Sequence, residues 1–257
     1  MSTLVEYRRD GIAARLTLNS PHNRNALSTA LVEQLHEGLR AAAADPEVRA
    51  VVLGHAGGTF CAGADLSGAA GDDPYDSAVA RGIEMAELLR AIVAAPLPVI
   101  GAIDGHVRAG GLGLVAACDI VVAGPHSSFA LTEARIGVAP AIISLTLLPK
   151  LTSRAAGRYY LTGEAFNAST AAEIGLISTA VDDVEESVAD LLADVGRASP
   201  QGLAASKALT TAEVLAGFDR HAARLAEESA RLFVSDDARE GMTAFLQKRP
   251  PRWATPS

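Results

Sequence analysis

The pattern of apolar and polar positions along the chain predicts alternating strands and helices. Residues 3–9 and 11–19 favour two strands, and the Asp10-Gly11 pair at their junction is typical of a hairpin turn. Short apolar runs predict further strands at 49–54, 96–103, 119–124 and 127–131. An α/β fold is therefore expected.

Much of the remaining chain has apolar residues at helical spacing, which predicts helices. Ser28 is suited to cap a helix that ends near residue 45. A helix over 75–95 is expected to turn these apolar residues inward: Ile83, Leu88, Leu89, Ile92 and Val93. From about residue 140 the pattern is almost entirely helical, and a boundary near residue 199 separates a core region, 1–198, from a helical region, 199–257.

The segment 108–119 is rich in glycine and has no side chain suited to proton transfer. Its glycines and Ala116 fit the dinucleotide-binding pattern G-x-G-x-x-A, and Glu133 follows at about the expected spacing. In that motif, however, the first glycine follows its strand directly, whereas residues 104–109 intervene here. We therefore reject a nucleotide site and look for another use of accessible backbone.

Composition, net charge and cysteine content restrict the class of protein and the partners that it can have. The chain has 257 residues, 49% of them hydrophobic, which is enough for one large domain with a substantial core. Its net charge of −8 argues against nucleic acid as a partner. Cys61 and Cys118 are the only cysteines, which predicts reduced thiols and no metal site. Because neither a signal peptide nor a membrane span is recognisable, we expect a cytoplasmic protein without a membrane partner.

Two loops, at 61–66 and 108–114, combine glycine with a small-residue helix start. Each could present a backbone N–H at a helix N-terminus, where unpaired donors and the helix dipole favour negative charge. Two such amides directed at one point form an oxyanion hole, which stabilises charge on a carbonyl oxygen. The alternative is that both loops are only tight packing corners.

Several segments together resemble the enoyl-CoA hydratase/isomerase, or crotonase, superfamily. The similar segments follow in order along nearly the whole chain: 19–27, 57–66, 104–120, 129–140, 156–181 and 241–253. The resemblance implies a spiral of ββα turns in region 1–198, and a C-terminal helical region that assembles a homotrimer or a dimer of trimers. It also implies an acyl-CoA substrate and no separate cofactor, because coenzyme A is part of the substrate.

The resemblance also assigns roles to individual residues. The oxyanion amides would be those of Ala64 and Gly110, and Glu133 would transfer protons as the catalytic carboxyl. The resemblance implies that these residues contact the substrate or its CoA moiety: Arg24, Ala26, Ala62, Ala64, Asp65, Leu66, Gly110, Phe245 and Lys248. The acidic, glycine-rich segment 67–82 is expected to form a lid over the acyl group.

One departure from the family pattern bears on the reaction. Hydratases of this family use two glutamates, and this sequence has Gly113 at the first position while keeping Glu133 at the second. We expect an enoyl-CoA hydratase, because the combined motifs resemble a hydratase subgroup that can lack the first glutamate. The alternatives are a double-bond isomerase that uses one glutamate and a CoA-binding or scaffold protein with little activity. Replacing Gly113 with glutamate is expected to favour hydration.

Overall fold

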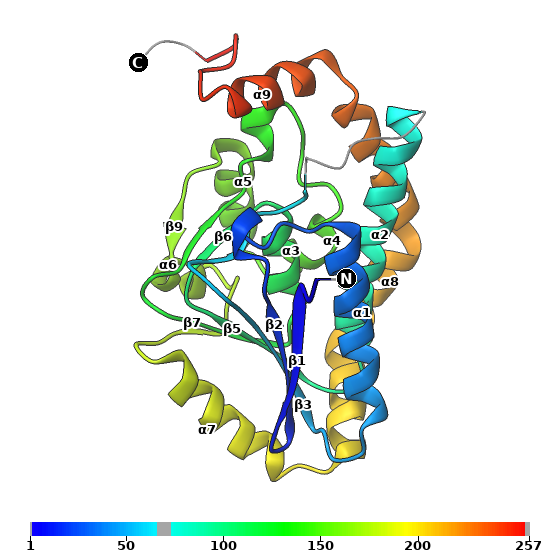
Figure 1. The fold of residues 1–257 in the computed structure, drawn as a ribbon, viewed down its shortest axis with the longest axis vertical. Coiled ribbons are helices and arrows are strands. Elements are labelled where there is room, and N and C mark those ends of the chain that lie inside the picture. Colours follow the sequence, from blue (N-terminus) through cyan, green and yellow to red (C-terminus); the bar gives the residue numbers. More distant parts are fainter. Residues whose placement is uncertain (1, 66–72, 255–257) are drawn as a thin grey trace.

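The computed structural model describes residues 2–65 and 73–254 (Figure 1). Strands β1 (Val5–Asp10) and β2 (Ala13–Leu18) form the predicted antiparallel hairpin. From β2 the large sheet continues in parallel through β3 (Ala50–His55), β5 (Val99–Ile103), β7 (Ile120–Ala123) and β10 (Thr179–Ala180). The predicted strands of this sheet are therefore confirmed.

A second, smaller sheet consists of very short strands. Its order is β4 (Thr59–Cys61), β6 (His106–Arg108), β8 (Ser128–Ala130) and β9 (Phe166–Asn167). Three successive turns of the chain each place one strand in the large sheet (β3, β5, β7) and the next in the small sheet (β4, β6, β8) before a helical segment follows. This repetition is the expected spiral of ββα turns.

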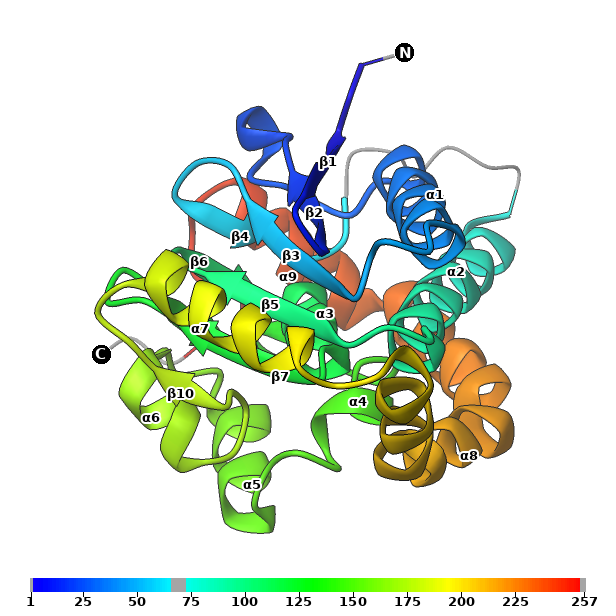
Figure 2. The ribbon, with the colours of Figure 1, turned by 90° about the horizontal axis from the view of Figure 1, so that it is seen from below.

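Helices lie on both faces of the large sheet, and others pack outside them. The helices of the described residues are α1 (Thr29–Ala44), α2 (Pro74–Ala94), α3 (Gly110–Ala117), α4 (Ser144–Leu147), α5 (Ser153–Thr162), α6 (Ala168–Glu173), α7 (Val184–Gly196), α8 (Pro200–Phe233) and α9 (Asp236–Leu246). Figure 2 shows α7 across one face of the sheet, where a small apolar cluster forms. The main core lies on the other face, against α1, α2 and α3. No helix within the described residues is long and apolar enough to cross a membrane.

Helix α1 begins as predicted, because the Ser28 side chain accepts a hydrogen bond from the Leu31 amide. In α2 the inward residues are also confirmed, with the exception of Ile83, whose surface is 42% exposed. At about 100° per residue, Ile83 lies on the opposite side of the helix from the stripe centred between Leu88 and Ile92.

Helix α8 lies alongside α2 over much of its length (Figure 1). Leu215, Phe218, Leu225 and Leu232 recur at near-helical spacing, which predicts an apolar face packed on other subunits. Phe218 is instead buried within its own chain, and Leu215 and Leu225 are partly buried against the same core. Leu232 remains 37% exposed. The difference arises because α2 offers α8 an apolar surface inside its own chain.

A buried lysine, which the sequence analysis did not single out, connects α8 to α2 and to the residues that precede β5 and β7. Lys207 forms an ion pair of 2.7 Å with the Asp119 carboxylate. It also donates to the carbonyl oxygens of Ile92, at 2.9 Å, and Leu97, at 3.0 Å. All three ammonium protons therefore have acceptors, which is the condition for burying such a charge.

Candidate active site

The two glycine loops meet at the ends of β4 and β6. A Cβ atom added to Gly63 would lie 2.9 Å from the Ala109 Cβ and 3.3 Å from the Gly110 nitrogen. Gly63 has φ 93° and Ala109 has φ 46°, so both loops turn through conformations that are rare for L-residues. The expected convergence of the loops is therefore present, and it requires glycine at position 63.

The amides of Ala64 and Gly110 are both available. Ala64 is exposed and Gly110 is half-buried. Neither N–H donates to an acceptor within residues 2–65 and 73–254. Gly110 begins α3, so its amide lies at a helix N-terminus as expected. Ala64 instead forms an isolated bridge with Leu27, and the segment that follows it is outside the described residues.

A buried asparagine that sequence reasoning missed shapes the loop beside Ala64. Arg24 and Asn25 both have positive φ, at 59° and 54°. The Asn25 side chain accepts from the Ser20 amide at 2.6 Å and donates to the Thr59 carbonyl at 2.8 Å. Asparagine tolerates this conformation better than most residues, and that preference is the signal that could have identified it.

Glu133 begins the 3-10 helix η3 (Glu133–Ile136), shortly after β8. Its side chain is buried, and its Oε2 atom has no hydrogen-bond partner among the residues that the structure describes. Desolvation raises the pKa of Glu133 from 4.5 to about 7. Because β6 and β8 are adjacent and parallel, Gly110 and Glu133 follow the same edge of the small sheet. A carboxyl that exchanges a proton near neutral pH is suited to acid–base catalysis.

Helix α9 packs directly against η3. A Cβ atom on Gly137 would lie 2.6 Å from the Asp237 carbonyl carbon, and one on Gly241 would lie 2.4 Å from the Ile136 oxygen. The two backbones can approach this closely only because both positions are glycine. The C-terminal helix therefore supports the segment that carries Glu133.

Two hydroxyl groups that the sequence analysis did not consider form a hydrogen-bonded pair in the elements that pack near η3. Tyr160, in the last turn of α5, is hydrogen-bonded to the Ser144 hydroxyl at 3.1 Å, and Ser144 donates to the Pro140 carbonyl at 2.6 Å. Burial, and to a lesser extent the charge of Glu133, raise the pKa of Tyr160 to about 12. No sequence motif marks these residues, because Ser144 begins α4 and Tyr160 lies in α5, so the pair forms only in the folded chain.

The position of the missing first glutamate is filled. A Cβ atom on Gly113 would lie 2.5 Å from the Ile143 Cγ2 and 3.3 Å from the Leu89 Cδ1. The gain in hydration expected from Gly113→Glu therefore stays a prediction, and it requires Ile143 to give up this space.

The residues expected to contact CoA divide into two groups. Arg24 is exposed, Ala26 is buried, and Ala62 and Asp65 are half-buried around the Gly63 loop. The Ala62 amide donates to the Arg24 carbonyl at 3.0 Å, which connects the two segments. Leu66 and residues 67–72 of the expected lid lie outside the described residues, whereas residues 74–82 belong to α2.

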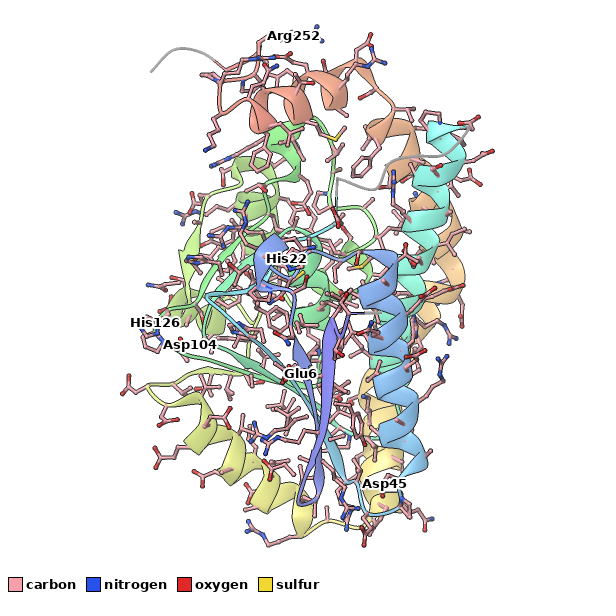
Figure 3. All side chains as sticks on the ribbon, viewed as in Figure 1. Glu6, His22, Asp45, Asp104, His126 and Arg252 are labelled. Atoms are coloured by element: carbon pink, nitrogen blue, oxygen red, sulfur yellow. The ribbon has the colours of Figure 1, made fainter. Side chains whose placement is uncertain are left out.

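Phe245 and Lys248 are not brought to the Arg24 loop within this chain. Both are exposed at the end of α9, and Phe245 is 60% exposed. In Figure 3 the label of Arg252, which follows α9, lies at one end of the long axis, far from His22 beside the Arg24 loop.

The thiols of Cys61 and Cys118 are both buried and free, and burial raises the pKa of each to about 12. They therefore stay protonated at neutral pH and have no nucleophilic character.

A separate hollow of about 520 Å³ lies between the large sheet and the start of α7. His55, Asp104 and Asp183 line it, together with Arg15 and Glu185. It contains none of the residues expected to form the active site, so its size does not identify it as the site.

Comparisons with known proteins give the family. Residues 8–256 match the family model described as enoyl-CoA hydratase/isomerase. The 2,3-dehydroadipyl-CoA hydratase of Escherichia coli is 32% identical over 254 residues, covering 98% of each chain. The structure of an enoyl-CoA hydratase from Mycobacterium avium is 70% identical, with a TM-score of 0.93 over 99% of this chain and 100% of that one.

A carnitinyl-CoA hydratase from Mycobacterium avium has the same fold at 31% identity, with a TM-score of 0.84 over 98% of this chain and 99% of the other. The ββα spiral, the converging loops and these similarities over the whole chain agree. The chain belongs to the enoyl-CoA hydratase/isomerase family.

Proposed function

We propose that this protein is an enoyl-CoA hydratase, which adds water across the α,β double bond of an acyl-CoA thioester. The observation that carries this proposal is Glu133, a buried carboxyl with an unpaired oxygen and a pKa of about 7. It follows the same edge of the small sheet as the free amide of Gly110. Relatives named as hydratases support the same reaction.

In the proposed mechanism the amides of Ala64 and Gly110 donate to the thioester oxygen. They stabilise the negative charge that forms there when water attacks the β-carbon. Protonated Glu133 gives its proton to the α-carbon, and the attacking water gives one of its protons to the carboxylate. Glu133 gives one proton to the substrate and receives one from the water, so it returns to its starting state. One carboxyl therefore serves as both acid and base.

Substrate binding follows the same assignment. Arg24, Ala26, Ala62, Asp65 and Leu66 would contact the CoA moiety beside the Gly63 loop. The named relatives act on different acyl groups, a dehydroadipyl and a carnitinyl group, so the family does not fix the acyl chain. A reaction without a further cofactor and a cytoplasmic location stay predictions from the sequence, and a role in fatty acid metabolism is proposed from the acyl-CoA substrate.

We also propose assembly into a homotrimer or a dimer of trimers through the helical region 199–257. Apolar side chains remain exposed toward the end of this region: Leu232, Val234, Phe245, Leu246 and Trp253. Their burial by another subunit would be favourable, and a neighbouring subunit would provide the CoA site that Phe245 and Lys248 do not reach within their own chain.

A second function, double-bond isomerisation, is favoured by one observation. Ile143 fills the position of the first glutamate, so Glu133 is the carboxyl left at this site from the family's pair. A single carboxylate is sufficient to remove a proton from the α-carbon of a 3-enoyl-CoA and to return it to the γ-carbon.

The two functions are distinguished by product analysis. Purified protein is incubated separately with crotonyl-CoA and with a 3-enoyl-CoA, and the products are separated by chromatography. The proposal expects 3-hydroxyacyl-CoA as the faster product. Conversion of the 3-enoyl-CoA without hydration would establish the isomerase, whereas binding of both esters without turnover would support the scaffold alternative.

A further inference from the structure

The attacking water of the proposed hydration has two hydrogens, and two acceptors would orient it. A water molecule that attacks the β-carbon is oriented best when both of its hydrogens have partners. Glu133 can accept one of them, and in relatives with two glutamates the other carboxylate could accept the second. Here Ile143 occupies the place of that carboxylate, with its Cγ2 2.5 Å from where a Cβ of residue 113 would lie.

Ser144, the residue next to Ile143, is hydrogen-bonded to the hydroxyl oxygen of Tyr160. Ser144 has one hydroxyl proton, and it donates that proton to the Pro140 carbonyl at 2.6 Å. The carbonyl can only accept. The hydrogen bond of 3.1 Å between Ser144 and Tyr160 must therefore use the phenol proton of Tyr160.

This direction leaves the Tyr160 oxygen free to accept. Tyr160 donates its own proton to Ser144. In such a chain of hydrogen bonds, a hydroxyl that donates becomes a stronger acceptor. The phenol stays neutral, since burial keeps its pKa high. It therefore acts as an acceptor of a hydrogen bond and not as a base.

Tyr160 is also held against the element that begins with Glu133. Arg135, in η3, donates to the Thr162 carbonyl at the end of α5 at 3.0 Å, which fixes the last turn of α5, with Tyr160 in it, on η3. Among the described residues the Oε2 of Glu133 has no hydrogen-bond partner, and the Tyr160 hydroxyl is close enough to be affected by the charge of Glu133.

We propose that Tyr160, oriented by Ser144, accepts the second hydrogen of the attacking water and so takes over the part of the missing glutamate. The inference rests on the proposed hydratase function. The proton balance is unchanged, because the proton that water loses still goes to Glu133 and Tyr160 exchanges none.

The test separates hydration from proton transfer at the α-carbon. Hydration of crotonyl-CoA needs the oriented water, whereas exchange of the α-proton of saturated butyryl-CoA in D₂O needs only Glu133 and the oxyanion amides. We expect Tyr160→Phe to lower kcat for hydration on the order of 10- to 100-fold, with KM and the exchange rate within about threefold of the parent. Ser144→Ala should act in the same direction with a smaller effect.

Tyr159→Phe is the matched control, because this neighbouring ring packs on Phe166 at 4.2 Å between centroids and should change neither rate. Hydration by Tyr160→Phe at the parent rate would overturn the assignment, as would an equal loss of hydration and exchange. If Glu133→Gln instead keeps the parent's rates in both assays, the proposed function itself fails.

Discussion

At Glu133 the burial that prepares the carboxyl for catalysis also opposes folding. Its pKa is raised from 4.5 to about 7, so the folded state binds more protons than the unfolded state between these values. The free energy of unfolding should therefore fall as pH rises through this window, by up to about 3 kcal/mol. Glu133→Gln removes this dependence. Urea unfolding should show the variant to be more stable than the parent at about pH 8, with the difference absent near pH 4; parallel pH profiles would contradict this.

Gly113 and Ile143 must change together if a second carboxyl is to be introduced. Gly113→Glu alone overlaps Ile143 and should lower the free energy of unfolding by about 1–3 kcal/mol without raising hydration. Gly113→Glu with Ile143→Ala should hydrate crotonyl-CoA faster than Ile143→Ala alone, because the removed side chain leaves room for the carboxylate. A rate equal to that of Ile143→Ala would argue against this use of the space.

At the scale of elements, α9 holds the segment that carries Glu133. Gly241→Ala places a Cβ atom against the Ile136 carbonyl and should displace η3, with a fall in kcat on the order of tenfold or more and a lower melting temperature. Gly217→Ala, on α8, is the control: its Cβ meets nothing within 4 Å, and alanine favours helix by about 1 kcal/mol. If both variants keep the parent's kcat, α9 does not position Glu133.

The sequence pattern identified elements whose signal is local. The hairpin, the Ser28 cap and the buried strands could all be predicted, because turn chemistry, capping and apolar runs act over a few residues. Strands β4 and β6 could not, since each consists of three residues between glycine loops, whereas the equally short β8 runs into the apolar segment 129–131. As a result, the glycine segment appeared to stand apart from a strand, although β6 directly precedes it.

The residues of the candidate site also divide into those with a local sequence signal and those without one. The residues that motif resemblance indicates, Ala64, Gly110 and Glu133, lie around the edge of the small sheet. Asn25, Ile143 and Tyr160 escaped notice because each acts through contacts between segments that are distant in sequence. Ile83, predicted to face inward, is exposed because it lies about 140° around the helix from Leu88.

At the scale of the whole molecule, the apolar side chains left exposed after residue 230 predict assembly. Leu232, Phe245 and Leu246 remain exposed although the preceding part of α8 is packed on α2. Light scattering behind size-exclusion chromatography at micromolar concentration should give a mass of three or six chains. Phe245→Ser with Leu246→Ser should shift the mass toward the single chain of 26.4 kDa. A parent that runs as a monomer would contradict the proposed assembly.

The central claim, that Glu133 carries the proton transfers of an acyl-CoA hydratase, is tested most directly by the turnover of Glu133→Gln with crotonyl-CoA. The account predicts a loss of kcat of about 10²- to 10⁴-fold, with acyl-CoA affinity within a few-fold of the parent because the amides of Ala64 and Gly110 remain. Glu227→Gln, the same change at an exposed ion pair on α8, should retain full activity. Turnover of Glu133→Gln near the parent's rate would contradict the account.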